Sequence, residues 1–286
     1  MIKYNSIEEI ILEAESRGTT ISDLVLEEQC EALEMDKKAI YDKMANSFAI
    51  MRKAAEDGMS TDEKSASGLS GGDAFKMKRC MDSDGLAGKV VAGVITRALA
   101  IAESNARMGK IVAAPTAGSC GILPATLLTI QDVHNISQEK IIMSMFTASA
   151  IGMVISENAT VAGSEGGCQA ECGSAAAMGA AAIVEAMGGS PRMVGNACAI
   201  ALKSILGLIC DPVAGLVEVP CIKRNASGAM NALSSAEMAL AGIESFIPVD
   251  EVILTMKAVG DALPFSLRET SLGGLAKTNT AKNFKL

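Results

Sequence analysis

Aromatic residues are scarce in this sequence. Trp is absent, and Phe, Tyr and Trp together make up only 3% of the 286 residues, whereas hydrophobic residues reach 49%. A core of the size that this content supports must therefore consist of aliphatic side chains, of the 17 Met, and of close contacts between Ala and Gly. Such contacts are typical of helices packed on helices, so the composition predicts an all-α, predominantly helical fold.

Positive charge is also in deficit, because 25 Lys and Arg stand against 33 Asp and Glu, for a net charge of -8. A surface of this sign repels phosphate backbones, which argues against a nucleic-acid partner. A bilayer span needs roughly 20 apolar residues, and the best candidates, 141–156 and 111–131, are short or interrupted by Pro and Gly. The N-terminus has neither the basic head nor the apolar run of an export signal. We therefore expect a cytoplasmic protein that does not bind a membrane.

Apolar residues at helical spacing, separated by Gly, Pro or Asn, indicate where the helices lie. Residues 6 to about 56 are charged and helical, and residues 57–88 lose the helical period. Further helices are expected over residues 87–107, 123–133, 138–155, 172–187, 191–206, 226–242 and 250–262. This pattern predicts a helical N-terminal region, 1–60, and a larger helical domain, 61–286, although it also allows a single domain.

The segment without helical period contains a loop rich in Gly and Ser, with the sequence SASGLSGGD over residues 65–73. Its glycines allow backbone conformations that other residues resist. The loop is a candidate for binding substrate, with Ser67, Ser70 and Asp73 as its polar side chains.

Eight Cys in a chain without an export signal indicate thiols or metal ligands instead of disulfides. Three of them, Cys168, Cys210 and Cys221, lie where Gly or Pro interrupts a helix. A thiol at such a junction extends from a fixed backbone beside free amides, which suits a metal cluster. Their spacing matches no compact metal-binding motif. For each of them the alternative remains that it is a small buried hydrophobic residue, as free Cys often is.

Four segments carry a resemblance to a known family. APTAG at 114–118, GSEGGCQ at 163–169, the stretch from CDPVAG to VPC at 210–221, and RETSLGGLA at 268–276 resemble, in this order, the alpha subunit of iron-sulfur-dependent L-serine dehydratases. The resemblance implies a helical fold, the conversion of L-serine to pyruvate and ammonia, and a 4Fe-4S cluster on Cys168, Cys210 and Cys221. Three thiolates leave one of four irons free to act as a Lewis acid on the serine hydroxyl. Whether Cys172 or Cys120 also contacts the cluster stays open.

The reaction also needs donors for the substrate carboxylate and a base for the α proton. We expect Thr116 and the turn at Gly118 to bind the carboxylate, whereas Ser67 and Ser70 of the loop resemble a family segment near the substrate. Glu165 and Glu171 flank Cys168 and are candidates to hold water or the substrate ammonium. The residues predicted to act catalytically are Asp73 of the loop and three residues that closely follow the third cysteine, Lys223, Arg224 and Asn225. A capping turn at Thr116 and a solvated patch at Lys223 and Arg224 are the ordinary alternatives.

The chain has one His, His134, at a polar helix end where we expect a surface residue. In two-subunit members of the family that this chain resembles, the beta subunit carries a Ser-Ser-Ser-His-Thr type segment and a regulatory domain. We therefore expect this chain to need a beta subunit that supplies the base. Two alternatives stay open: an L-cysteine desulfidase of the same superfamily, and a metal-free helical scaffold. A pyridoxal phosphate enzyme would need a Schiff-base Lys, for which the sequence has no motif.

Overall fold

The computed structural model describes residues 3–81, 83 and 86–284, and this part of the chain contains thirteen α-helices. Its only β pairing is a single parallel bridge between Cys210 and Arg268. The prediction of an all-α fold is confirmed. The expectation of no export signal concerns the N-terminus, and its first two residues lie outside the described part.

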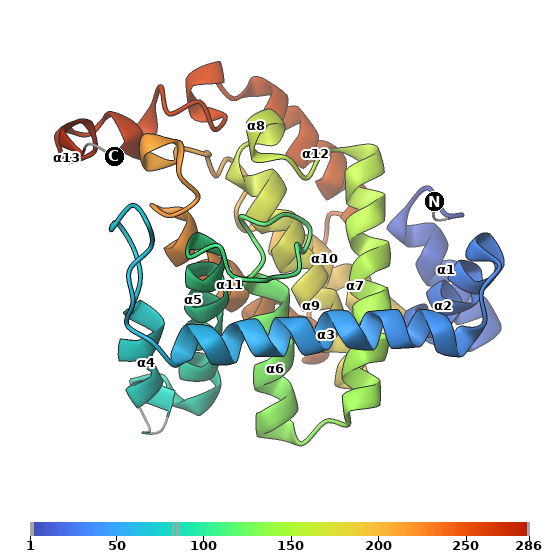
Figure 1. Cartoon of the computed structure of the whole chain (residues 1–286). Coiled ribbons are helices and arrows are strands. Elements are labelled where there is room, and N and C mark those ends of the chain that lie inside the picture. Colours follow the sequence, from blue (N-terminus) through green and yellow to red (C-terminus); the bar gives the residue numbers. More distant parts are fainter. Residues whose placement is uncertain (1–2, 82, 84–85, 285–286) are drawn as a thin grey trace.

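Short connections join most of the helices, and longer ones precede α4, α6, α11 and α13 (Figure 1). Their bounds are α1 Ile7–Arg17, α2 Ile21–Leu33, α3 Lys37–Met59, α4 Asp73–Met81, α5 Gly88–Ala106, α6 Ile122–His134, α7 Gln138–Asn158, α8 Gly163–Gly166, α9 Ser174–Ala186, α10 Pro191–Lys203, α11 Cys221–Leu240, α12 Val249–Ala262 and α13 Asn279–Asn283. One turn of π-helix, Gln169–Gly173, precedes α9, and short 3-10 turns lie at Val213–Gly215, Phe265–Leu267 and Gly274–Lys277.

Helix α9 is the centre of the packing. Its sequence, SAAAMGAAAIVEA, is built from small residues, and every residue except Glu185 is buried. Helices α6, α7, α10 and α11 surround it (Figure 1). At Gly179 an added Cβ would lie 3.1 Å from the Cβ of Ala232 on α11. The small residues therefore let the neighbouring helices approach closely, which explains how a core almost without aromatic side chains is filled.

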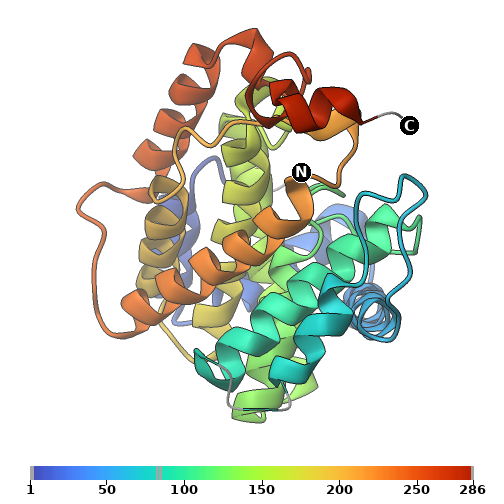
Figure 2. The same ribbon diagram turned by 90° about the vertical axis from the view of Figure 1, so that its left-hand side faces the viewer.

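Helix α7 is long and apolar enough to cross a bilayer by length and composition, but 67% of its most apolar window is buried inside the protein. It packs against α9, α2 and α3. The long helix α3 runs across α5, α6 and α7, as Figure 1 shows from the front and Figure 2 along the axis of α3. Helix α7 is therefore a core helix of this fold.

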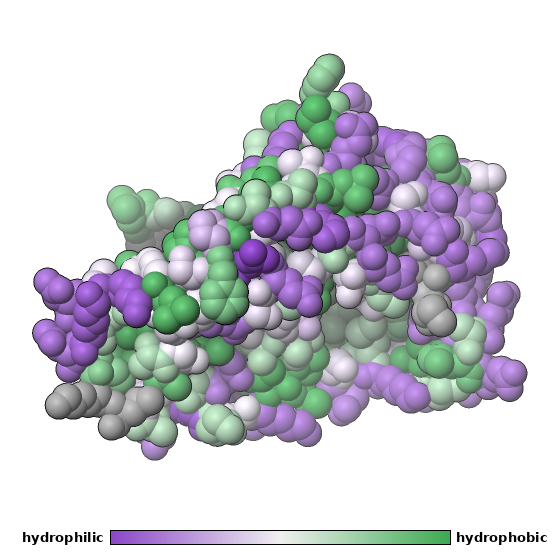
Figure 3. Space-filling view, turned by 90° about the horizontal axis from the view of Figure 1, so that it is seen from above, coloured by the Kyte–Doolittle hydropathy of each residue, from purple (hydrophilic) through white to green (hydrophobic). Residues whose placement is uncertain are grey.

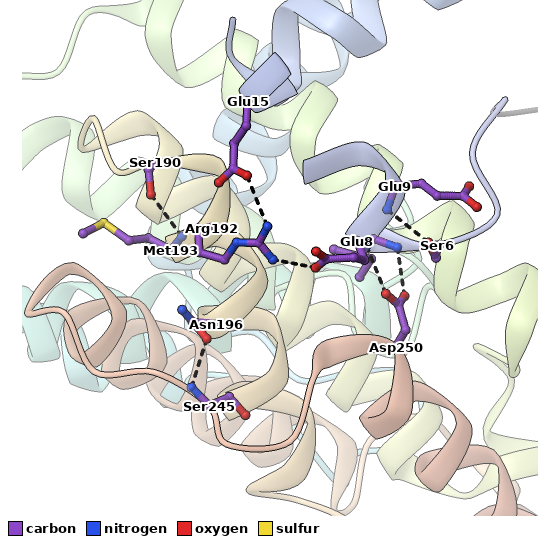
Figure 4. Close-up of polar contacts among 11 residues, drawn as sticks. Ser6, Glu8, Glu9, Glu15, Ser190, Arg192, Met193, Asn196, Ser245 and Asp250 are labelled. Carbon is purple, nitrogen blue, oxygen red and sulfur yellow. Dashed lines mark hydrogen bonds and ion pairs between the residues drawn. The ribbon is translucent and has the colours of Figure 1, made fainter. Parts of the chain in front are cut away.

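The N-terminal helices dock on the C-terminal half of the chain (Figure 4). The carboxylate of Asp250, on α12, accepts hydrogen bonds from the backbone amides of Ile7 and Glu8 at 2.8 and 3.0 Å. Arg192 on α10 pairs with Glu8 at 2.6 Å and with Glu15 at 3.2 Å. A carboxylate at a helix N-terminus satisfies free amides and the helix dipole. One buried hydrophobic cluster extends from Tyr4 through α12; the division near residue 60 stays a prediction.

Two of the predicted boundaries are wrong. Helix α4 lies within the segment expected to be irregular, because the buried carboxylate of Glu103 accepts hydrogen bonds from the first amides of this helix, at Asp73 and Ala74. Helix α11 begins at Cys221, five positions before the expected start at Ala226. Pro220 directly precedes it and restricts the backbone there. The polar residues after Cys221 are therefore helical.

The chain after α12 forms irregular turns over the upper end of the molecule (Figures 1 and 2). Seen from above, hydrophobic and hydrophilic residues are interspersed over this face (Figure 3). Among the exposed large hydrophobic residues of this segment are Phe265, Leu272 and Leu275. The inner side of the same segment packs on the loop that carries Cys210, since the backbone amide of Cys210 donates to Leu267 O at 2.9 Å.

Candidate functional site

The three candidate ligands come from three different parts of the chain and are all buried. Cys168 connects α8 to the π-helical turn, Cys210 lies in the extended stretch paired with Arg268, and Cys221 is the first residue of α11. Their exposed fractions are 1%, 2% and 6%. All eight cysteines of the chain are free thiols. Cys168 and Cys221 therefore lie next to or at the first residue of a helical element, whereas Cys210 lies in an extended connection between α10 and α11.

The backbone around Cys168 requires glycine. Gly167 has a φ of 76°, and an added Cβ would lie 2.7 Å from Leu263 and 2.9 Å from Leu208 O. The amide of Gln169 donates to Leu208 O at 2.9 Å, and its side chain bridges Met256 O and the amide of Gly207. These bonds hold the Cys168 turn against the chain that leads to Cys210.

Asp211 and Arg224 connect the segments of Cys210 and Cys221. Arg224, on α11, pairs with the buried Asp211 at 2.9 Å and donates to Ile209 O at 2.9 Å. The other oxygen of Asp211 accepts from the amide of Leu275 at 2.7 Å. Although burial disfavours its charge, the nearby Cys168 and Asp211 raise the pKa of Arg224. The guanidinium is therefore a fixed positive charge beside the cysteines.

The thiols share one electrostatic environment. Burial raises the pKa of the Cys221 thiol to about 12, and the negative charge of Cys168 adds to this effect. The same two causes raise the pKa of Cys210. The sulfur atoms of Cys168 and Cys172 are 3.3 Å apart, and the hydrogen bond between them lowers the pKa of Cys168 and raises that of Cys172. Since a metal binds thiolates, it must displace protons from these buried thiols.

Glu171 lies between the cysteines and the turn at 114–118. It accepts a hydrogen bond from the Thr116 hydroxyl. An added Cβ at Gly118 would lie 2.5 Å from Glu171 Oε1, and one at Gly163 would lie 3.1 Å from Cys210 Sγ and 3.5 Å from Glu171 Oε2. Burial raises the pKa of Glu171. The structure therefore brings Thr116 and Gly118, the predicted carboxylate-binding residues, next to Glu171 and the cysteine site.

Asn225 is fully buried, and its side chain joins the same turn to α11. Its Nδ2 donates to Gly118 O at 2.7 Å and to Cys221 O at 3.0 Å, and its Oδ1 accepts from the amide of Gly121 at 2.8 Å. Both ends of the amide are thus engaged with backbone. In this arrangement Asn225 holds the 116–118 turn beside Cys221.

The glycine loop is closed by a carboxylate that the sequence analysis did not single out. Ser65 and Ser67 donate to Glu218 at 2.6 and 2.8 Å, and Ser70 donates to it as well. Glu218 comes three positions before Cys221 and is 6% exposed. Ser67 and Ser70 are therefore placed near the third cysteine, with their hydroxyls bound to this carboxylate.

Asp73 and Lys223 form an ion pair at 2.5 Å, in which 61% of the Lys223 side chain is exposed. The hydrogen bond from Lys223 lowers the pKa of Asp73. The pair joins the end of the glycine loop to the first turn of α11. Of the predicted catalytic residues, Arg224 and Asn225 therefore lie beside the cysteines, whereas Asp73 and Lys223 lie at the edge.

Cys168, Cys210 and Cys221 offer thiol sulfurs, which are the donors that iron-sulfur clusters use. Among the described residues, no three His, Cys, Asp or Glu side chains lie close enough to hold one metal ion. In a cluster each thiolate binds a different iron, so the ligands lie further apart than around one ion. Cys168, Cys210 and Cys221 are free and buried, so their sulfurs are not engaged in disulfides.

The single histidine lies away from this site. His134 is exposed and ends α6, whose first turn follows the 116–118 turn, so it lies roughly 18 Å along the helix from that turn. Glu218, Glu103 and Asp211 are the polar residues of the site that the sequence analysis missed. They bind partners from distant parts of the chain, which no local pattern indicates.

Comparison with known proteins gives consistent matches. The family model described as "Serine dehydratase alpha chain" matches residues 16–276. The chain is 45% identical to the probable L-serine dehydratase, alpha chain, of Bacillus subtilis, over 99% of this chain and 94% of that protein. It is 43% identical to the L-serine dehydratase, alpha chain, of Peptoniphilus asaccharolyticus, over 98% and 97%. The L-serine dehydratase of Streptomyces coelicolor is 37% identical over 96% of this chain and 60% of its own length.

Proposed function

The chain belongs to the serine dehydratase alpha-chain family, and from this premise we propose that it is the catalytic alpha subunit of an L-serine dehydratase, converting L-serine to pyruvate and ammonia. The observation that carries the proposal is that three buried, free thiols from segments far apart in the sequence share Glu171 as a charged neighbour, and that Cys168 is a charged neighbour of the other two. Filler cysteines have no reason to gather around one arginine and one carboxylate. The proposed location of the enzyme is the cytoplasm.

Cys168, Cys210 and Cys221 would hold a 4Fe-4S cluster. When bound, the cluster supplies an iron without a protein ligand, which polarises the substrate hydroxyl as a Lewis acid. The positive charge of Arg224 lies beside Cys168 and offsets the negative charge of the thiolates. Cys172, whose sulfur is 3.3 Å from that of Cys168, is close enough to shield it from solvent.

Thr116 and the turn to Gly118 would bind the substrate carboxylate. The Thr116 hydroxyl already donates to one carboxylate, that of Glu171, so its position suits such an acceptor. Asn225 holds the turn in place through its hydrogen bonds with Gly118 O and Gly121 N. A substrate carboxylate that takes the Thr116 hydroxyl would leave Glu171 free to accept a hydrogen bond from the substrate ammonium.

Removal of the α proton needs a base. The one histidine of this chain, His134, is exposed at the far end of α6 and so is not placed to be that base. The relatives named alpha chains imply a second, beta chain, and the Streptomyces protein contains further sequence beyond the part matched here. We propose that a beta subunit supplies the base histidine and a regulatory domain.

Anaerobic reconstitution with iron and sulfide, with and without the beta subunit, tests the proposal. We expect a brown protein that forms pyruvate from L-serine only in the two-subunit complex. Replacing Cys168, Cys210 or Cys221 by Ser should abolish both the iron absorption and the activity. Cys198→Ser is the matched control, because Cys198 is a fully buried thiol on α10. Pyruvate formation by the alpha chain alone would refute the need for a borrowed base.

Assaying L-cysteine beside L-serine separates the proposed activity from that of a desulfidase. Sulfide release from cysteine that outpaces pyruvate formation from serine would contradict the proposal. A colourless, iron-free protein after anaerobic purification would instead support a metal-free scaffold.

A further inference from the structure

Glu218 is the only described carboxylate that accepts hydrogen bonds from three serine hydroxyls. Ser65 and Ser70 donate to its Oε2, and Ser67 donates to its Oε1. Burial alone would raise its pKa, but the three hydroxyls lower the pKa below the ordinary value for Glu. The carboxylate is therefore an ionised group held in the interior by donors from a single loop.

These bonds determine the shape of the loop. Ser65 N donates to Ser70 O at 3.0 Å, and the Lys64 ammonium donates to Gly71 O at 2.8 Å, so the loop closes on itself. Gly71 has a φ of 114°, and an added Cβ there would lie 2.3 Å from Glu63 O. The serine hydroxyls then point inward together. With the carboxylate between them, each of the three hydroxyls has an acceptor for its single proton.

Glu218 also belongs to the turn that carries the third cysteine. The amide of Ile222 donates to Glu218 O at 3.0 Å, and Val213 N donates to Val219 O at 2.8 Å. At the other end of the loop, Glu103 binds the first amides of α4 and Lys223 pairs with Asp73. The loop is thus attached to the Cys221 turn at both ends, through side chains distant in sequence.

We propose that Glu218 is a positioning residue, which holds the glycine loop in the conformation that receives the substrate and joins it to the Cys221 turn. The role toward L-serine rests on the function proposed above, whereas the role in holding the loop does not. A loop that must be ordered at each binding event lowers the affinity for substrate, and a loop already held in place avoids that loss. Glu218 therefore acts on binding more than on the chemical step.

Glu218→Gln in the reconstituted complex tests the role in binding. The variant keeps the size of the side chain but replaces one acceptor by a donor. We expect KM for L-serine to rise roughly tenfold to a hundredfold, the effect of losing one hydrogen bond to a charged group, while kcat changes far less. Ser70→Ala should act in the same direction, and its effect should be much smaller in the Glu218→Gln background. Ser227→Ala, an exposed serine on α11, is the control and should leave both constants unchanged.

Trypsin cleavage after Lys64 tests the loop without any turnover. Lys64 is exposed and lies at the start of the loop, where its ammonium donates to Gly71 O. Lys110, an exposed residue in a coil, serves as the internal reference. We expect Glu218→Gln to be cut faster after Lys64 than the parent chain, with unchanged cleavage after Lys110. In the complex, L-serine should slow the cut after Lys64 in the parent.

The outcomes separate the two proposals. Unchanged KM together with unchanged cleavage after Lys64 overturns the role of Glu218, and so does a loss of iron and thermal stability without an effect on KM. If the parent complex forms no pyruvate, the proposed function fails. The cleavage rates then decide the role in the loop: faster cutting of the variant supports it, and equal rates overturn it.

Discussion

Arg224 pairs with Asp211 and so connects two of the three cysteine segments. The two groups are 2.9 Å apart, with 17% of the arginine and 2% of the aspartate side chain exposed, and the same guanidinium donates to Ile209 O. Arg224→Met removes the charge and keeps an unbranched side chain of moderate length. Asp211 would then remain buried with only the Leu275 amide as a partner.

The expected loss follows from this burial. Removing one partner of a buried ion pair costs about 3–5 kcal/mol, because the other charge is left uncompensated. The remaining hydrogen bond from Leu275 N, at 2.7 Å, places our expectation near the lower end, about 3 kcal/mol. Arg192→Met is the matched control, since Arg192 pairs with Glu8 and Glu15 on the surface with 43% of its side chain exposed. Exposed pairs contribute about 0–1 kcal/mol.

Urea unfolding of the alpha chain under reducing, anaerobic conditions measures both losses. The double variant Arg224→Met with Asp211→Asn should recover part of the stability, because no buried charge is then left unpaired. We also expect the iron content after reconstitution to fall for Arg224→Met and not for Arg192→Met. Equal losses of unfolding free energy for the two single variants, or no recovery in the double variant, would refute the reasoning.

Three further predictions concern other parts of the molecule. Gly163→Ala should displace Cys210 and lower iron retention, measured by absorption after reconstitution, because the new Cβ would lie 3.1 Å from its sulfur. Burial raises the pKa of Glu185 in the folded state, so its ionised form weighs against folding. The gain in unfolding free energy from Glu185→Gln, relative to the parent, should therefore be largest at pH 8. It should disappear as the pH falls toward the ordinary pKa of Glu, about 4.3. Urea unfolding at several pH values checks this, and a difference independent of pH would contradict it. His134→Ala should change kcat/KM of the complex by less than roughly twofold, since the residue is exposed and outside the site.

The helical fold could be predicted because it depends on local and compositional properties. The period of the apolar residues predicts α5, α6, α7, α10 and α12 to within a few residues of their observed bounds. The abundance of Ala and Gly in α9 already indicates close helix packing. The start of α11 and the existence of α4 were missed, because the amides of α4 are bound by Glu103, a residue of another helix.

By itself, the sequence determined the helical class, through composition and the period of the apolar residues, and it proposed three candidate cysteines through the resemblance of four segments to a known family. Only the tertiary structure decided which carboxylates surround them. Glu218 meets Ser65 across 153 positions of the chain, and Glu171 meets Thr116 across 55. Such contacts depend on how whole helices pack, and the free energy of that packing is spread over the entire core. No short segment of sequence therefore contains the information that brings these side chains together.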